Sequence, residues 1–418
     1  MNLEKHNPHW KENFFYQFDI NRSFFDKLVK NTNNRQIITL SGLRRTGKTV
    51  LMKQLIDFLI KEKSQRANIL YYSFDEEQPK VEEIINEFEK LTDIDKNKTK
   101  IYIFFDEIQK LEDWQNQIKY YYDNFNIKFF ISGSSSLFIR KKAKESLAGR
   151  SFDFYLPPLS FKEFLIFREK QELINKSKLF QLELKKEFNL YLKRQFIETI
   201  NESEEFISDY VKSVIEKVVY IDIPKVFTIE HQDLLLRLIK VIASNPGMII
   251  EYESLGRELG INRVTLSNYL FYLGEAFLIK KAYNFSKNRL TSEKKAKKFY
   301  LNSTSFFPYL YPEIDESKLI ENLIAIESNA RFFWRTPFKD EIDFILEDFN
   351  NKIYPLEVKY KNIVSSKDVK IIIKFCKKMN LNEGIVVTKD LEEKRTLVKD
   401  GKKIKISFIP AWKWLLEH

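Results

Sequence analysis

The stretch Gly42-Leu43-Arg44-Arg45-Thr46-Gly47-Lys48-Thr49 decides the fold of the N-terminal part of this chain. The apolar residues 37–40 before it predict a buried strand, and residues 50–60 after it carry apolar side chains at helical spacing. A strand, a glycine loop and a helix in this order are typical of a phosphate-binding loop. The glycines let the backbone curve closely around phosphate oxygens, and N–H groups of the loop and the first helical turn point at the anion.

The last two residues of this loop predict its ligand. Lys48 is expected to reach the β- and γ-phosphates of ATP, and Thr49 is expected to bind Mg²⁺. Only 10 glycines occur in 418 residues, so two at this spacing before Lys-Thr argue against coincidence. Two alternatives stay open: an ordinary glycine turn that begins a helix, and a phosphate-binding loop that has lost hydrolysis.

A second apolar run, residues 101–105, is closed by two acids, Asp106 and Glu107. This pattern is the second signature of an ATPase. Asp106 would hold magnesium through water or Thr49, and Glu107 would polarise the attacking water as the general base. The alternative is an acidic strand end that begins a helix, since Asp and Glu favour helix N-termini. The phosphate-binding loop upstream favours the catalytic interpretation.

A third apolar run, residues 128–134, predicts a strand that ends in small polar residues. In a parallel sheet its carboxyl end would reach the same crevice as the phosphate-binding loop, so Ser132 could sense the γ-phosphate or water. Equally, Ser134 to Ser136 could simply cap the next helix. Arg150 is a candidate arginine finger, because its planar charge suits a phosphoryl transition state, and a surface salt bridge is the alternative.

Apolar spacing predicts the other N-terminal elements. Residues 1–34 are a polar lead-in with one helix at 24–29, residues 69–74 are a strand, and residues 79–91 are a helix.

Length and composition limit the classes of protein to which the chain can belong. A length of 418 residues predicts about three domains, and 44% hydrophobic residues suffice for real cores. No apolar run reaches the length of a membrane span, and residues 1–7 contain no signal-peptide core, so we expect a cytoplasmic protein with no membrane partner. The single Cys376 excludes an intrachain disulfide and is expected in the core. The net charge of +11 favours an anionic partner such as nucleic acid, although lysine is frequent throughout the chain.

Five motifs occur in the order of a known family: residues 42–49, Phe-Phe-Asp-Glu-Ile-Gln at 104–109, Ile-Ser-Gly-Ser-Ser-Ser at 131–136, Leu-Ala-Gly-Arg at 147–150 and Leu-Ser-Phe-Lys-Glu-Phe at 159–164. With them, residues 20–410 resemble the archaeal and bacterial AAA-type P-loop ATP-binding proteins. Those proteins carry a C-terminal winged helix and a restriction-endonuclease-like domain of unknown function. The resemblance implies ATP and Mg²⁺ as cofactors. It also implies a homo-oligomer in which Arg150 would act from a neighbouring subunit.

The resemblance also implies an α/β fold in four parts. These are a P-loop NTPase core with a parallel sheet at residues 1–158, a helical lid at 159–228, a winged helix-turn-helix at 229–302 and a small restriction-endonuclease-like α/β domain at 303–418.

Residues 231–300 carry the pattern of the winged helix. Helices are predicted at 234–242 and 252–259, and the predicted recognition helix begins at Arg263 and ends before Gly274 as its C′ residue. A basic hairpin follows, with Lys280, Lys281, Lys287, Arg289, Lys294, Lys295, Lys297 and Lys298 against one acid, Glu293. We expect DNA contacts from Arg263, Asn268, Lys294, Lys295, Lys297 and Lys298. A solvated connector or a protein-binding module is the alternative.

Two segments near the C-terminus, residues 341–346 and 354–360, alternate with period two and predict a hairpin. The predicted pattern places Ile342, Phe344 and Leu346 on one side, as it does Leu356, Val358 and Tyr360. Asp343, Glu357 and Lys359 would then share the opposite face. Centring the turn on Asn350 puts Asp343 opposite Glu357, and opposed carboxylates repel each other unless a cation lies between them.

The family's fold implies a role for these residues. Asp343 and Glu357 would bind Mg²⁺, Lys359 would activate water or stabilise the phosphate, and Glu321 matches an additional acid. The chain departs from the stricter pattern with Ile342 in place of proline. A surface hairpin with a Glu357–Lys359 pair, or a degenerate nuclease fold used only for binding, are the alternatives.

Together these patterns predict a magnesium-dependent ATPase that couples hydrolysis to nucleic-acid binding, with metal-dependent DNA cleavage by the C-terminal domain as an extension. The alternative is an ATP-gated regulatory switch or recruiting module that cleaves nothing.

Overall fold

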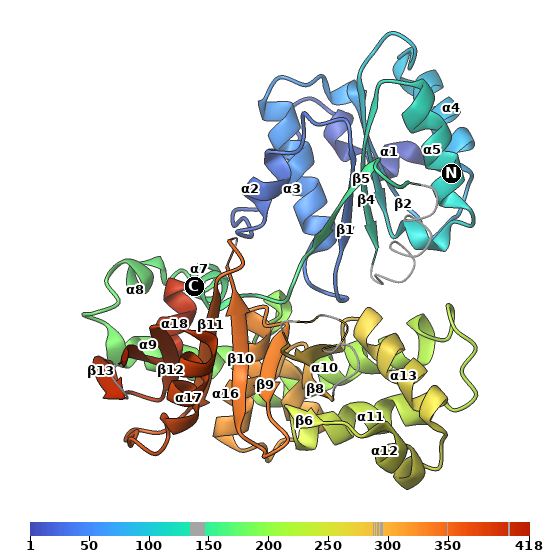
Figure 1. The fold of residues 1–418 in the computed structure, drawn as a ribbon. Coiled ribbons are helices and arrows are strands. Elements are labelled where there is room, and N and C mark those ends of the chain that lie inside the picture. Colours follow the sequence, from blue (N-terminus) through green and yellow to red (C-terminus); the bar gives the residue numbers. More distant parts are fainter. Residues whose placement is uncertain are drawn as a thin grey trace. The chain divides into compact units, whose positions relative to one another are not determined.

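The computed structural model describes residues 1–133, 147–286, 288, 290, 292, 296–348, 350–399 and 402–418. The chain forms two compact units, Met1–Pro158 and Leu159–His418 (Figure 1). Within the described residues, no helix has the length and apolar character that a membrane span requires.

The first unit is built on a sheet with the strand order β2-β3-β4-β1-β5, in which every pair is parallel. The strands are β1 Ile37–Ser41, β2 Ile69–Ser73, β3 Ile101–Asp106, β4 Ile127–Gly133 and β5 Ser151–Tyr155. The helices are α1 Leu3–His6, α2 Phe25–Val29, α3 Lys48–Lys61, α4 Val81–Thr92 and α5 Trp114–Asn124. The predicted strands and helices around the phosphate-binding loop are therefore confirmed.

Both faces of this sheet are covered (Figure 1). Leu51 and Leu55 of α3 pack with Ile38 of β1 on one face. Phe88 of α4 and Trp114 of α5 pack on the other face. A parallel sheet needs both faces buried, which explains why its strands are apolar along their whole length instead of alternating.

The N-terminal lead-in is more ordered than its polar sequence predicted. Helix α1 and the 3₁₀ turn Pro8–Trp10 lie against the edge strand β2. The Asn7 side chain donates to Tyr71 O at 3.0 Å and accepts from Tyr71 N at 2.6 Å. It thereby imitates a neighbouring strand and covers an edge that would otherwise expose unpaired backbone groups.

The second unit is built on a nine-stranded sheet with the order β13-β14-β12-β11-β10-β9-β7-β8-β6. Its strands are β6 Met248–Ile249, β7 Ile279–Asn284, β8 Lys297–Leu301, β9 Phe332–Arg335, β10 Glu341–Glu347, β11 Ile353–Lys359, β12 Glu383–Thr388, β13 Glu393–Lys399 and β14 Lys402–Pro410. Parallel pairing of β7 with β9 joins the hairpin of the predicted winged helix to the C-terminal strands. The sheet therefore crosses the domain boundary expected at residues 302 and 303.

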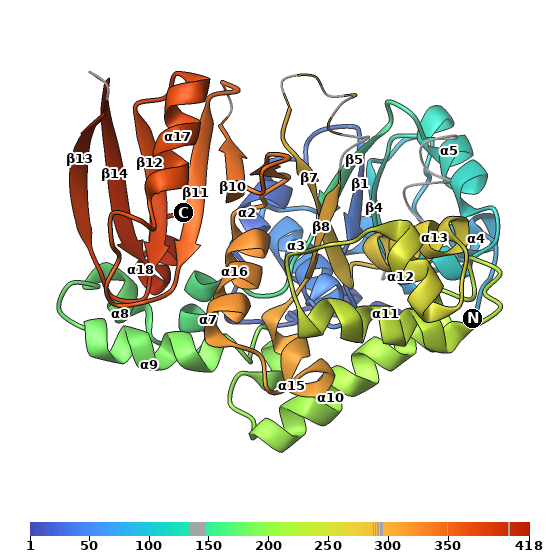
Figure 2. The same ribbon diagram turned by 60° about the horizontal axis from the view of Figure 1, so that its bottom comes forward.

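The helices of the second unit surround this sheet (Figure 2). They are α7 Phe161–Phe167, α8 Gln171–Asn175, α9 Gln181–Tyr191, α10 Glu204–Lys217, α11 Gln232–Ser244, α12 Tyr252–Leu259, α13 Arg263–Glu275, α15 Phe307–Leu310, α16 Glu316–Glu327, α17 Lys370–Met379 and α18 Ala411–Glu417.

Residues 159–228 were expected to form a helical lid on the ATPase core, and the structure shows them packed with other helices of the second unit. Phe161 of α7 and Phe188 of α9 share an apolar cluster with Leu323 of α16 and Trp414 of α18. Helices α7, α9 and α18 lie together (Figure 2). The segment therefore belongs to the core of the second unit, because its aromatic side chains are buried there.

The helices predicted at 252–259 and from Arg263 onward form, with one correction. Gly274 was expected to end the recognition helix, but α13 continues to Glu275. The left-handed residue after the helix is Phe277, with φ of 60°.

The C-terminal hairpin also forms with one correction. Ile342 was expected to share a side with Phe344, but it packs with Ile345 and Trp334, whereas Phe344 packs with Leu356. A register shift in the pairing of β10 with β9, between Ile342 and Ile345, breaks the alternation.

Candidate nucleotide site and carboxylate cluster

The phosphate-binding loop follows the carboxyl end of β1 and leads into α3. Gly47 has φ of 91°, a conformation that glycine adopts without a steric cost. Gly42 is needed for a different reason, because a Cβ there would lie 2.5 Å from the Leu156 carbonyl oxygen. The buried Lys48 ammonium donates to the carbonyls of Gly42 at 3.1 Å and Leu43 at 2.9 Å, so it lies within the loop.

An arginine that the sequence analysis missed fixes this loop. Arg22 is buried and donates to Thr46 O at 2.9 Å, Pro157 O at 3.0 Å and Pro158 O at 3.2 Å. It connects the loop to the segment after β5. No local sequence pattern distinguishes Arg22 from the other basic residues of the lead-in.

Asp106 at the end of β3 is the centre of the site. Its carboxylate accepts from the Thr49 hydroxyl at 2.5 Å and from the Tyr71 hydroxyl at 3.0 Å. The buried Ser132 hydroxyl, at the end of β4, also donates to it. Thr49 and Asp106 thus offer a hydroxyl and a carboxylate side by side, and hard oxygen ligands of this kind suit Mg²⁺.

Tyr71 is a second residue that sequence reasoning missed. Burial, and then the charge of Asp106, raise its pKa well above the ordinary value for tyrosine. It therefore stays a neutral hydrogen-bond donor to the Asp106 side chain.

Glu107 lies directly after Asp106 with φ of 52°, a left-handed conformation that is uncommon for a non-glycine residue. Its carboxylate accepts a hydrogen bond from the Gln109 amide, and its backbone N–H donates to Asp106 Oδ1 at 3.1 Å. Strained backbone of this kind often occurs at functional sites.

Arg150 lies at the other end of the strands. Its carbonyl accepts from Ile37 N at 2.8 Å, next to the amino end of β1, whereas the phosphate-binding loop follows the carboxyl end. The guanidinium binds Asp123 through two contacts of 2.8 and 3.1 Å. The geometry therefore favours the salt-bridge alternative within one subunit. Ser134 and Ser136 lie outside the described residues.

A second constellation lies in the C-terminal unit, where β10 and β11 bring Asp343 and Glu357 together as the hairpin predicted. Asp343 N donates to Glu357 Oε2 at 3.3 Å, and Val358 N donates to Asp343 Oδ2 at 2.8 Å. Lys359 forms an ion pair with Glu357 at 2.5 Å. Burial, and then the charge of Glu321, raise the pKa of Asp343. Burial and the charge of Asp343 likewise raise the pKa of Glu357.

One lysine of the expected basic wing, Lys298, is buried instead of exposed. It was expected to contact DNA from the wing, but its side chain is only 3% exposed. Its ammonium lies 2.6 Å from Glu341, 3.5 Å from Glu321 and 4.0 Å from Asp343. Burial opposes its charged form, but the three carboxylates outweigh burial and raise the pKa of Lys298.

Further cations neutralise the outer side of this carboxylate cluster, which we define as Glu321, Glu341, Asp343 and Glu357. Lys318 binds Glu321 at 3.0 Å, and Arg335 binds Glu341 at 3.0 Å. Among the residues that the structure describes, no group of three or more His, Cys, Asp or Glu side chains is arranged to hold a metal ion. The Lys298 ammonium lies among Glu321, Glu341 and Asp343, and Lys359 pairs with Glu357, so the cluster does not fit a metal as it stands.

The other residues that were expected to contact DNA differ in their exposure, and some lie outside the described part of the chain. Arg263 is exposed on α13 and lies 3.4 Å from Glu253, and Asn268 is exposed on the same helix. Lys297 is half-buried at the start of β8. Lys294 and Lys295, like Lys287, Arg289 and Glu293, lie outside the described residues.

The chain is similar to known proteins over most of its length. Residues 34–165 match the sequence-family model of an AAA domain, and residues 197–317 and 314–412 match two domains of unknown function. An uncharacterised protein of Methanocaldococcus jannaschii is 27% identical and aligns with 96% of this chain and 91% of its own length. A protein of Haemophilus influenzae is 26% identical over 79% of this chain and 84% of its own length.

Among solved structures, the Aeropyrum pernix ORC2 protein in its ADPNP–ADP complexes is similar with a TM-score of 0.43 and 14% identity, covering 77% of this chain and 98% of that one. The family-model match and the loop geometry define the class: the N-terminal unit is a P-loop domain of the AAA type.

Proposed function

We propose that the N-terminal unit is a magnesium-dependent ATPase. The observation that supports this proposal is the contact between the Thr49 hydroxyl, which follows Lys48 in the chain, and the Asp106 carboxylate, because these two groups would bind magnesium. Lys48 would bind the β- and γ-phosphates, and the N–H groups at the start of α3 would bind phosphate oxygens. Magnesium, held by Thr49 and Asp106, would neutralise charge on the phosphates when bound.

Glu107 is the proposed general base. It would take a proton from the water whose oxygen attacks the γ-phosphorus, while the bond from the γ-phosphorus to the bridging oxygen of ADP breaks. Ser132 would hold the position of the Asp106 carboxylate through its hydrogen bond.

The direct test is equilibrium ATP binding by Lys48→Ala. Removal of this ammonium should weaken binding at least tenfold, about 1.4 kcal/mol or more. Lys61→Ala, at the exposed end of the same helix, is the matched control and should bind like wild type. Equal binding by a folded Lys48→Ala protein would refute the nucleotide site.

Nucleic-acid binding by the C-terminal unit is the second candidate function. The exposed Arg263 and Asn268 on α13 favour it, as does the net charge of +11. A recognition helix that binds duplex DNA would lose affinity in Arg263→Glu, and ATP should change this affinity if the two units are coupled.

DNA cleavage at Asp343, Glu357 and Lys359 finds less support. Each carboxylate of the cluster already has a cationic partner, so a magnesium ion between Asp343 and Glu357 would have to compete with Lys298 and Lys359. The ATP-dependent binding switch without cleavage is the better-supported alternative. Magnesium-dependent nicking of plasmid DNA that Asp343→Asn abolishes would instead establish the nuclease.

A further inference from the structure

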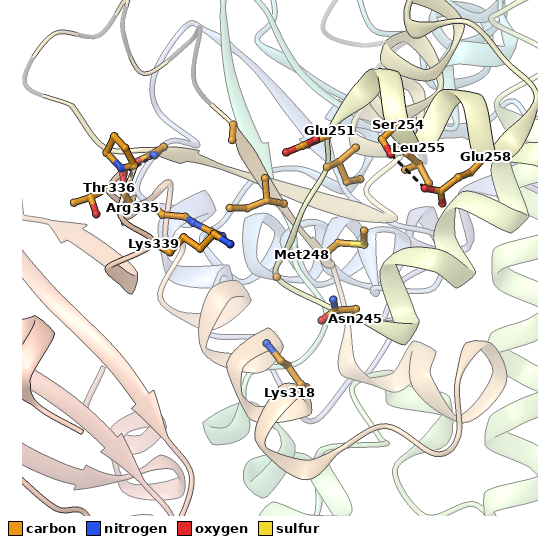
Figure 3. Close-up of a pocket in the computed structure, with 16 residues that line it drawn as sticks. Asn245, Met248, Glu251, Ser254, Leu255, Glu258, Lys318, Arg335, Thr336 and Lys339 are labelled. Carbon is orange, nitrogen blue, oxygen red and sulfur yellow. Dashed lines mark hydrogen bonds between the residues drawn. The ribbon is translucent and has the colours of Figure 1, made fainter. Parts of the chain in front are cut away.

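A groove of about 930 Å³ lies within the C-terminal unit. One wall is formed by α12 and the segment that leads into it from residue 245 (Figure 3). The opposite wall is formed by Arg335 at the end of β9 and by Thr336, Pro337 and Lys339 of the turn that follows, and α16 contributes Lys318. All of these segments belong to one compact unit, so the groove is a property of that unit alone.

The wall formed by the turn and α16 is basic. Arg335, Lys339 and Lys318 project into the groove (Figure 3). Lys318 and Arg335 each form an ion pair with one acid of the carboxylate cluster, and these pairs hold both cations at the groove. A guanidinium has five N–H donors, so Arg335 can contact an anion in the groove while it binds Glu341.

The wall formed by α12 differs in chemistry. Met248 and Leu255 supply apolar surface, and Glu251 and Glu258 supply carboxylates (Figure 3). Glu258 accepts from the Ser254 hydroxyl at 3.3 Å. Carboxylates accept hydrogen bonds from exocyclic amino groups such as that of cytosine, and apolar side chains pack against base faces.

The turn of the basic wall also carries an exposed aromatic side chain. Phe338 is 90% exposed, and its neighbours in the sequence, Pro337 and Lys339, both line the groove. The turn that carries it is closed by hydrogen bonds from Thr336 N to Asp340 O at 2.9 Å and from Lys339 N to Thr336 O at 3.0 Å. A closed turn can present a phenyl ring to a ligand with little loss of backbone entropy.

We propose that this groove binds an unpaired nucleic-acid strand. Its phosphates would lie along Lys318, Arg335 and Lys339, its bases would face α12, and Phe338 would stack on a base at the rim. This inference rests on nucleic-acid binding by the C-terminal unit, but it uses a surface other than α13.

The asymmetry of the walls selects a single strand over a duplex. An unpaired strand carries its anionic groups on one side and its amino-bearing bases on the other, as the two walls require. A duplex carries phosphates on both outer sides, so one backbone would approach Glu251 and Glu258 and be repelled. Stacking on an exposed aromatic ring also requires a base that is not already stacked on both faces.

The test is fluorescence anisotropy with the full chain, a labelled 15-nucleotide single strand and the matching duplex. Phe338→Ala should weaken single-strand binding by roughly 5- to 150-fold, the range for one base–aromatic stack. Lys339→Gln should weaken it too and reduce the salt slope by about 0.7, as expected for one phosphate contact. Both residues are exposed, so the variants should melt like wild type.

Phe206→Ala on α10 and Lys403→Gln on β14 are the matched controls, since both side chains are exposed and neither lines the groove. Single-strand affinity unchanged by Phe338→Ala and Lys339→Gln would overturn the groove proposal. If duplex binding still depended on Arg263 in that case, the winged-helix function would stand. A protein that binds neither probe would overturn both.

Discussion

Lys298 of β8 and Glu341 of β10 form an ion pair of 2.6 Å, and the lysine side chain is only 3% exposed. The pair connects the strand of the predicted wing to the C-terminal hairpin across β7 and β9, which lie between them in the sheet. A buried charge is tolerated only with partners, so Lys298 and the carboxylate cluster depend on each other.

Lys298→Met should therefore destabilise the protein strongly. The variant leaves Glu341, Glu321 and Asp343 near one another without the buried cation, a change that costs roughly 3–5 kcal/mol. Urea unfolding measures the loss. Lys281→Met on the neighbouring strand β7 removes an exposed lysine and should change stability by less than about 0.5 kcal/mol.

The Lys298→Met variant also tests whether the Lys298 ammonium takes the place that a metal ion could occupy. If Lys298 occupies the place of a cation, magnesium should raise the melting temperature of Lys298→Met more than that of wild type, because the ion could replace the ammonium. Equal stability of Lys298→Met and wild type in the absence of magnesium would contradict the structural role of the lysine.

Glu107→Gln should retain ATP binding and lose hydrolysis. The amide keeps the shape of the side chain but cannot accept the proton of water, so single-turnover hydrolysis should fall by at least about 100-fold. Glu112→Gln, an exposed acid just beyond the same strand end, should hydrolyse ATP at the wild-type rate. Undiminished turnover in Glu107→Gln would show that another group is the base.

Arg150→Ala should hydrolyse ATP at close to the wild-type rate, because Arg150 lies at the amino end of the sheet in a pair with Asp123. Asp123→Ala should behave in the same way. A large loss in Arg150→Ala, with recovery when it is mixed with Lys48→Ala, would instead establish an arginine finger that acts across a subunit contact.

The buried His9 side chain should make the folded protein less stable in acid. Its ring contacts Ile69 O at 3.1 Å and the Tyr16 hydroxyl at 3.2 Å, and burial lowers its pKa to about 4. The unfolded chain takes up a proton near pH 6.5, whereas the folded chain resists protonation until about pH 4. The stabilisation is therefore complete above pH 6.5 and is lost as the pH falls toward 4.

The measurement is the difference in unfolding free energy between wild type and His9→Gln across this range. Glutamine can still donate to the Ile69 carbonyl but does not titrate. The advantage of wild type should shrink by about 3 kcal/mol between pH 7 and pH 4, from 1.36 kcal/mol per pKa unit. A difference that is independent of pH would mean that His9 does not control acid stability.

The local elements of the nucleotide site were predictable from sequence. Residues 42–49 predicted the loop before Lys48, and the apolar run before Asp106 predicted the strand. Each depends on a few consecutive residues whose backbone geometry and apolar spacing are local properties. The α12 helix was predictable for the same reason. The hairpin in which Asp343 lies opposite Glu357 was also predictable, because the alternation of side chains and the position of the turn determine the register of the two strands.

Long-range contacts were not predictable in this way. Arg22 and Tyr71 reach the nucleotide site from other elements, and nothing in their neighbouring sequence marks them. The bulge that turns Ile342 away from Phe344 depends on pairing with β9, so a strict alternation within β10 could not reveal it.

The sequence by itself determined a phosphate-binding loop, two acids at the end of a strand and a lysine-rich hairpin in the second half of the chain. Only the tertiary structure decided that Arg150 lies at the opposite end of the strands from the loop and that Lys298 is buried among carboxylates. The physical reason is that a charge has no fixed role of its own. Burial and the partners that folding brings within a few ångströms decide whether it faces a ligand, water or another charge.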